Sequence, residues 1–157
     1  EGTLRLGEIL KESTVICDIK GGTKKKVVAL LASRLKTAGL INDIDPVVRV
    51  VMERESLGST GIGDGVAIPH GKLGGFGQIM CVFARSRKGV DFDAVDGKPV
   101  HIFFLVLAPE DSASLHLMAL SRISRILRDP SFRRRLLEMP DDARLLYQSI
   151  VEEDEKY

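Results

Sequence analysis

Apolar residues recur with a helical period in the first third of the chain. Between Thr23 and Ala38 they return every fourth position, and Gly39 follows as a helix stop. The pair Asp45-Pro46 then provides an N-cap and a first-turn proline, and apolar residues continue at helical spacing to about Ser56. The pattern therefore predicts two helices, over residues 23–38 and 45–56.

The last third of the chain repeats this period. The residues Asp111-Ser112 open a predicted helix that ends at Asp129-Pro130, with apolar side chains along one side. Two shorter helices are predicted over Phe132 to Met139 and over Asp141 to Val151. The acidic residues that follow, from Glu152 to Glu155, begin a tail that we expect to fray as far as residue 157.

Several stretches between the helices predict β-strands. Ile79 to Ala84 and Val100 to Leu107 are short apolar runs rich in Val, Ile and Phe, which is typical of strands buried on both faces. Val90 to Asp93 alternates like a strand, and a short strand is expected around Val66 to Ile68. Helices around buried strands predict a single α/β domain over residues 1–157, a three-layer α/β/α sandwich.

Composition excludes several classes of function. The 157 residues hold 23 basic and 22 acidic side chains, so a net charge of +1 provides no general field for nucleic acid or an anionic membrane. Without tryptophan and with only 5% aromatic residues, the chain offers no stacking platform for single strands. The longest apolar run, Ile102 to Ala108, is too short to span a bilayer, and no secretory signal is visible. We therefore expect a cytoplasmic protein without nucleic-acid or membrane partners.

Neither the cysteines nor the histidines have the spacing of a metal site. Cys17 and Cys81 stand alone in apolar surroundings and are expected to be buried, reduced thiols. His70, His101 and His116 are too far apart in sequence for a local set of metal ligands. The chain is therefore expected to need neither a metal nor another cofactor.

The segment from Gly58 to Gly77 contains eight of the 15 glycines and is expected to be a system of loops. Such loops often bind nucleotides, but the spacing of a phosphate loop and that of the dinucleotide fingerprint are both absent. Gly61, Gly63 and Gly65 instead alternate strictly. The segment therefore does not predict a nucleotide site.

His70 is the candidate for chemistry in this segment. It stands between Pro69 and Gly71 at the end of the short predicted strand, where we expect a rigid, accessible position. Neutral imidazole is abundant near pH 7 and attacks a phosphoryl group without a separate base, forming a phosphohistidine. The alternative is an ordinary loop histidine in a tight turn, and the spacing alone leaves both interpretations open.

A phosphoryl group beside His70 needs hydrogen-bond donors around its oxygens. Arg54 offers a guanidinium fork, and Ser59 and Thr60 offer hydroxyls. Glycines such as Gly61 and Gly71 offer unhindered backbone N–H groups. These residues are the candidates for binding the phosphoryl group.

The other two histidines and the arginine clusters are harder to assign. His116, near the start of its helix, is either a partner of His70 or part of a polar helix face, whereas His101 is expected to be structural. Basic residues recur three apart at Arg122, Arg125 and Arg128, and again at 133–135. A solvated face is the expected explanation, and a docking surface for an acidic partner is the alternative.

The segment from Gly58 to Leu73 resembles the active-site segment of enzyme IIA domains of the fructose/mannitol type in the bacterial phosphoenolpyruvate-dependent phosphotransferase system. The resemblance is strongest to the nitrogen-regulatory branch, and it continues through Phe92 to Val100 and the helix of His116. It implies a mixed central sheet covered by helices. It also implies that a phosphocarrier, HPr or its nitrogen-branch relative NPr, phosphorylates His70, with His116 and Arg54 as the other active-site residues.

The resemblance leaves more than one role open. Nitrogen-branch members are regulatory acceptors of the phosphoryl group, whereas transport members pass it to an enzyme IIB domain for sugar uptake. A protein of another class, a binding module without covalent chemistry, is the third reading. Asp64 stands where many nitrogen-branch relatives have asparagine, which would place a negative charge near the phosphorylated loop.

Overall fold

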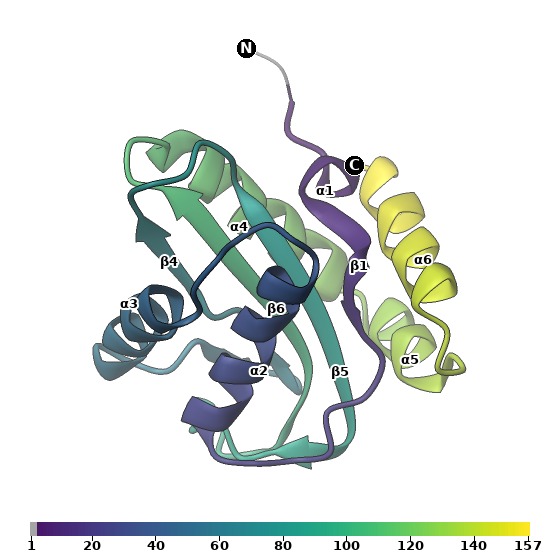
Figure 1. Cartoon of the computed structure of the whole chain (residues 1–157). Helices are drawn as coiled ribbons and strands as arrows, with labels where there is room; N and C mark the ends of the chain where they lie inside the picture. The colour runs from purple at the N-terminus through teal and green to yellow at the C-terminus, as the bar shows by residue number, and fades with distance from the viewer. Residues whose placement is uncertain (1–2) are drawn as a thin grey trace.

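A central sheet of six strands lies between two layers of helices in the computed structural model, which describes residues 3–157 (Figure 1). The strands are β1 (Leu10–Ile16), β2 (Gly61–Gly63), β3 (Val66–Ala67), β4 (His70–Leu73), β5 (Met80–Val90) and β6 (Val100–Pro109). β5 and β6 pair antiparallel at the centre, and β1 runs parallel to β5. On its other side β6 pairs in parallel with both β3 and β4. The sheet is therefore mixed.

The helices divide between the two faces. They are α1 (Leu6–Ile9), α2 (Lys24–Thr37), α3 (Asp45–Ser56), α4 (Ala113–Leu127), α5 (Pro130–Glu138) and α6 (Ala143–Glu155). Buried residues of α2 and α3 form one apolar cluster with the sheet, and those of α1, α4, α5 and α6 form another on the opposite face. Figure 1 shows α2 in front of the central strands and α4 behind them. The predicted three-layer α/β/α sandwich is confirmed.

The two central strands explain why both faces are apolar. Along β6, Phe104 and Val106 belong to the cluster under α4, whereas Phe103 and Leu105 belong to the cluster under α2 and α3. Side chains alternate across a strand, so a strand covered on both faces needs an unbroken apolar run. The apolar runs of the sequence correctly identified these two strands, although β5 extends further, to Val90.

Two other sequence predictions for this part of the chain need correction. Residues 91–93 are not a strand, because the chain leaves β5 at Val90, and Phe92 fills the core from a loop. The glycine-rich segment holds three short strands in place of one. In addition, β1 was not predicted, because its three exposed polar residues interrupt the apolar pattern.

The acidic C-terminal tail is ordered helix, so the prediction of fraying is wrong. Helix α6 continues to Glu155 because the Asp154 carboxylate is buried and accepts hydrogen bonds from Leu6 N at 2.8 Å and Arg122 Nε at 2.8 Å. Glu153 is also buried and pairs with two cations. Arg122 is accordingly buried, which corrects its assignment to a solvated face, whereas Arg128 is exposed.

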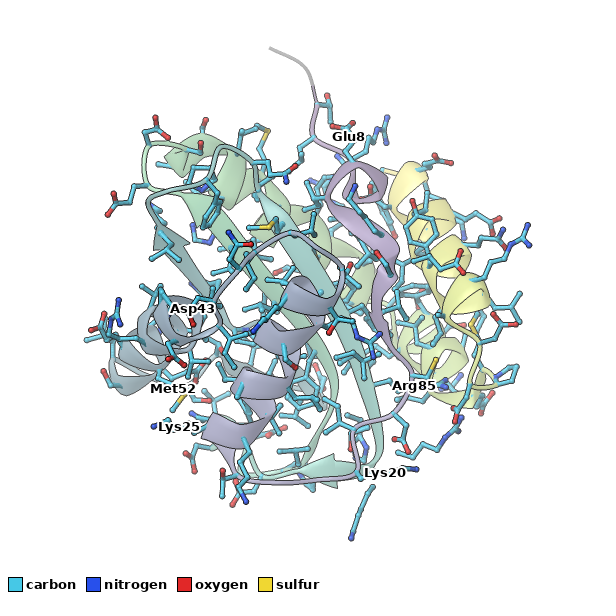
Figure 2. The ribbon with its side chains drawn as sticks, viewed as in Figure 1. Glu8, Lys20, Lys25, Asp43, Met52 and Arg85 are labelled. Carbon is cyan, nitrogen blue, oxygen red and sulfur yellow. The ribbon has the colours of Figure 1, made fainter. Side chains whose placement is uncertain are left out.

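Arg85 is fully buried at the side of the sheet and anchors the connection between α5 and α6 (Figure 2). Its Nε donates to Cys17 O at 2.9 Å, and its Nη1 donates to Leu136 O at 2.7 Å and Met139 O at 2.6 Å. Its Nη2 pairs with Asp141 at 2.8 Å. The guanidinium thereby satisfies the carbonyls at the end of α5. Cys17 beside it is only partly buried, unlike the fully buried Cys81.

Candidate functional site

A pocket of about 720 Å³ opens where α3, β4 and α4 meet. Arg54 contributes to it from the last turn of α3, and His70, Gly71 and Lys72 from β4. His116 contributes from the first turns of α4. Three residues singled out separately in the sequence, two histidines and an arginine, therefore share one pocket.

His70 is the first residue of β4, and its ring is held by one hydrogen bond. Its Nδ1 lies 2.8 Å from Ile68 O. A carbonyl oxygen only accepts, so Nδ1 carries the proton in the neutral ring, and Nε2 keeps its lone pair. The side chain is half-buried beside the pocket. The geometry thus leaves the lone pair of Nε2 available to a group in the pocket.

Gly71 explains why α3 lies so close to His70. A Cβ placed on Gly71 would come within 2.3 Å of Val50 Cγ1, which is closer than any real contact. The glycine therefore allows α3 to pack directly on β4. This packing brings the C-terminal turn of α3, with Arg54, to the rim of the pocket. Gly71 acts here through its small size.

His116 faces His70 edge to face. The ring centroids are 5.2 Å apart, with an angle of 72° between the planes. His116 is buried, and its Nε2 has no hydrogen-bond partner among residues 3–157. A buried polar atom without a partner is unfavourable, and an anionic group or a water between the rings would satisfy it.

Burial controls the charge of both histidines. Desolvation is the main cause that lowers the pKa of His116 to about 4, and the neighbouring His70 and Lys72 contribute to this shift. Desolvation also lowers the pKa of His70, and the positive charge of Arg54 adds to this. The hydrogen bond to Ile68 and the charge of Glu55 act in the opposite direction. Both rings are therefore neutral near pH 7, as a nucleophile must be.

Two cationic side chains flank the histidines. Arg54 Nη1 donates to Gly58 O at 2.9 Å, which orients its guanidinium at the end of α3. Lys72 lies two residues after His70 on β4, and alternate residues of a strand share a face. Lys72 lines the same pocket. Lys72 is not among the residues predicted for the site, although its spacing of two from His70 within a strand is a usable signal. The positive potential suits a dianionic phosphoryl group.

The other candidate phosphoryl ligands have different partners. Ser59 donates to Phe92 O at 2.8 Å, and the buried Thr60 donates its hydroxyl to Glu55. Gly61 starts β2 and pairs with Ala67. These three residues shape the loop behind the pocket, whereas Gly71 lines it.

Asp64 and His101 lie elsewhere on the molecule. Asp64 is exposed, has a left-handed φ of 58°, and lines a separate hollow with Ser124 and Arg128. Its charge therefore does not belong to the histidine pocket. The Nδ1 of His101 lies 2.8 Å from Ser86 O, which fits the predicted structural role.

Within residues 3–157, no group of three or more His, Cys, Asp or Glu side chains is placed to hold a metal ion. Over the same residues, none of the helices has the length and apolar character needed to cross a membrane.

Comparison with known proteins gives consistent matches over almost the whole chain. The family model described as "Phosphoenolpyruvate-dependent sugar phosphotransferase system, EIIA 2" matches residues 8–152. The nitrogen regulatory protein of Bradyrhizobium diazoefficiens is 39% identical over 141 residues, which cover 89% of this chain and 90% of that protein. The fructose-specific EIIABC component of Bacillus subtilis is 37% identical over 135 residues, but this chain spans only 21% of its length.

The fold has a solved counterpart. The crystal structure of nitrogen regulatory protein IIA-Ntr from Neisseria meningitidis matches with a TM-score of 0.84 and 36% identity, covering 92% of this chain and 98% of that one. The resemblance noted from residues 58–73 is thus confirmed over the length of the domain.

Proposed function

The chain belongs to the type 2 enzyme IIA family of the phosphoenolpyruvate-dependent sugar phosphotransferase system, and on this premise we propose that it accepts a phosphoryl group on His70. The donor is a phosphocarrier of the HPr or NPr type, and the acceptor serves regulation in the nitrogen-related branch. One observation carries the proposal: a neutral His70 with a free Nε2 faces a second neutral histidine, His116, across the pocket.

The transfer follows from the state of the His70 ring. The lone pair of Nε2 attacks the phosphorus, the N–P bond of the donor histidine breaks, and its electron pair returns to the donor nitrogen. The His70 ring gains positive charge as the new N–P bond forms. The Nδ1–H bond to Ile68 O strengthens at that moment, because a charged donor forms the stronger hydrogen bond.

The flanking groups act on the phosphoryl oxygens. The Arg54 guanidinium has N–H groups beyond the one that donates to Gly58, and Lys72 adds a second positive charge. The unpartnered Nε2 of His116 supplies a further donor in the tautomer that carries its proton. Together they stabilise the charge that spreads over the oxygens in the transition state.

Exposed apolar side chains beside the pocket support docking of a protein donor. Leu57 is 84% exposed and Leu117 is 68% exposed, and both line the pocket rim. Exposed large apolar groups beside a reactive centre are typical of a surface that a partner covers. The carrier would place its phosphohistidine between these two leucines.

A regulatory role has more support than a transport role. The nitrogen regulatory proteins of Bradyrhizobium and Pseudomonas are 39% and 36% identical to this chain over 141 and 149 residues, and the solved relative with a TM-score of 0.84 is also a nitrogen regulatory protein. The alternative is a fructose-type enzyme IIA that passes the phosphoryl group to an enzyme IIB, and the 37% identity to a fructose-specific component favours it as second candidate.

Intact-protein mass spectrometry tests the proposal directly. The chain is incubated with phosphoenolpyruvate, enzyme I and either HPr or NPr, beside His70→Ala and His101→Ala. Wild type and His101→Ala should gain one acid-labile phosphoryl group, and folded His70→Ala should gain none. Phosphorylation of His70→Ala, or no phosphorylation of wild type with either carrier, would refute the proposal. In the latter case anion binding without a mass change would indicate a binding module.

A chase experiment separates the two roles. Radiolabelled phosphorylated chain is mixed with fructose-type enzyme IIB domains, and the label is followed. Retention of the label on this chain fits the regulatory acceptor. Rapid movement onto an enzyme IIB would establish the transport role instead.

A further inference from the structure

A buried carboxylate lies directly behind the histidine pocket. The side chain of Glu55, next to Arg54 in the last turn of α3, is only 2% exposed. Its Oε1 accepts from Lys24 Nζ at 2.9 Å and from Thr60 N at 3.2 Å, and its Oε2 accepts from the Thr60 hydroxyl. Both oxygens are therefore engaged, and the charge is paired.

Hydrogen bonds continue from this carboxylate to the nucleophile. Thr60, held by Glu55, accepts at its carbonyl from Ile68 N at 3.0 Å. The carbonyl of the same residue, Ile68, accepts from His70 Nδ1 at 2.8 Å. A chain of three residues thus links the Glu55 carboxylate to the atom that sets the tautomer of His70.

The same glutamate also anchors the turn that orients Arg54. Gly58 N donates to the Glu55 carbonyl at 3.1 Å, and Gly58 O accepts from Arg54 Nη1 at 2.9 Å. Thr60, two residues further on, is tied to the Glu55 side chain. The turn from residue 55 to residue 60 is therefore held at both ends.

We propose that Glu55 is a positioning residue for phosphoryl transfer: through Thr60 it keeps the Arg54 guanidinium and the His70 ring in one fixed arrangement. The inference rests on the proposed function, because it concerns the same reaction at His70. Glu55 touches neither the phosphoryl group nor the reacting nitrogen. It acts by linking the end of α3 to the strand that carries the nucleophile.

Glu55 also has an electrostatic effect that serves as an independent readout. The titratable and charged groups around His70 are Glu53, Arg54 and Glu55 from α3, Lys72 from β4 and His116 from α4. Glu55 raises the pKa of His70, against the larger lowering by burial. Replacing its carboxylate with a neutral amide should therefore lower the pKa of His70 further.

The test measures phosphorylation of His70 by two donors, the phosphocarrier and the small molecule phosphoramidate. The variants are Glu55→Gln, Thr60→Val and Thr60→Ser. Glu153→Gln is the matched control, because Glu153, like Glu55, is a buried and ion-paired glutamate, but it lies on α6. Phosphoramidate needs no docking surface, so the pair of donors separates chemistry from recognition. Melting temperature and the NMR titration of His70 are recorded for each variant.

We expect Glu55→Gln and Thr60→Val to lower the maximal rate about 10-fold or more with both donors, because small misplacements of reacting groups have effects of this size. The carrier concentration for half-maximal rate should stay close to that of wild type. Thr60→Ser keeps the hydroxyl and should retain the rate, and Glu153→Gln should lose stability without losing rate. In Glu55→Gln the His70 titration should move to lower pH.

The outcomes distinguish this inference from the proposed function. If wild type accepts no phosphoryl group from any donor, the proposed function fails. If wild type is phosphorylated and folded Glu55→Gln and Thr60→Val react at the wild-type rate, only the positioning role is refuted. Equal rate losses in Glu55→Gln and Glu153→Gln would also refute it, since general destabilisation would then explain both.

Discussion

The ring of His116 stands edge to face against the ring of His70, with 5.2 Å between their centroids. The two rings come from α4 and β4, and the two histidines are 46 positions apart in the sequence. One ring has its Nδ1 bound to a backbone carbonyl, and the other has an unpartnered Nε2 among the residues that the structure describes. The pair is therefore asymmetric: under the proposed function, His70 is the nucleophile and His116 binds the oxygens of the phosphoryl group.

This asymmetry predicts different effects of the two histidine substitutions. His116→Ala should slow phosphoryl transfer by about 10²-fold without abolishing it, because removal of one transition-state donor has an effect of that order. His70→Ala should abolish transfer. Single-turnover rates with phosphorylated carrier measure both effects, and thermal unfolding verifies that the variants are folded. Complete loss of acceptance in a folded His116→Ala would show that His116 is itself the nucleophile or an obligatory relay.

The lowered pKa of His116 predicts a specific pH dependence of stability. Its pKa is about 4 in the folded protein and about 6.5 when unfolded, so the unfolded chain binds more protons between these values. The free energy of unfolding should therefore fall as pH falls from 6.5 to 4, by up to about 3 kcal/mol from this residue. Urea denaturation at pH 7 and pH 4.5 measures the difference. His116→Gln has no imidazole to titrate, so its unfolding free energy should differ less between the two pH values. A difference as large as that of wild type would contradict the lowered pKa of His116.

The planar guanidinium of Arg54 predicts that a positive charge alone at this position does not give the wild-type rate of phosphoryl transfer. Arg54→Lys keeps a positive charge but loses the planar fork and the rigid bond to Gly58 O. We expect transfer to slow about 10-fold in Arg54→Lys and about 100-fold in Arg54→Ala, by analogy with other transition-state donors. Arg49→Ala removes an exposed arginine of the same helix and should keep the wild-type rate. Equal rates for Arg54→Lys and wild type would mean that only the net charge matters.

Because α3 packs so closely on β4, we expect the size of residue 71 to affect both the stability of the fold and the rate of phosphoryl transfer. Gly71→Ala places a methyl group only 2.3 Å from Val50 Cγ1, and it should destabilise the fold by about 1–3 kcal/mol and slow transfer. Val50→Ala removes the clashing atom, so the double variant should regain stability and rate relative to Gly71→Ala. Denaturation curves and transfer rates of the four proteins form a double-mutant cycle. If the stability and rate effects of the two substitutions are additive, the side chains of residues 71 and 50 do not clash.

Sequence patterns predicted the layers of this fold because most of its elements obey simple rules. The helix from Lys24 begins after Thr23, whose hydroxyl caps it, and the central strands are apolar on both faces. The patterns failed where contacts with residues distant in sequence determine whether a side chain is buried. Phe92 is buried without belonging to a strand, and Arg122 is buried because Asp154, 32 residues away, neutralises it. Long-range pairing of this kind leaves no local signal.

The site was only partly predictable, because residue type alone does not determine which side chains point into the pocket. His70, His116 and Arg54 were recognised as chemically suitable residues, and the structure brings all three to one pocket. Ser59 and Thr60 are equally suitable by residue type, but their hydroxyls bind Phe92 O and Glu55. Residue type shows what a side chain can do, whereas the direction in which it points depends on neighbours that are distant in sequence.

The buried Asp154 predicts that the last helical turn is essential for stability. Removing residues 152–157 deletes the partner of Arg122 and the acceptor of Leu6 N, and leaves a buried guanidinium unpaired. Loss of one member of a buried pair typically destabilises by about 3–5 kcal/mol, so the truncated chain should unfold at much lower urea concentration. Deletion of Tyr157 alone keeps the pair and should have little effect. A truncated chain as stable as wild type would show that the acidic end of α6 contributes no more than a frayed tail, whereas a large loss confined to the longer deletion would show that the buried carboxylates of this turn, Asp154 and Glu153, hold α6 against its neighbours.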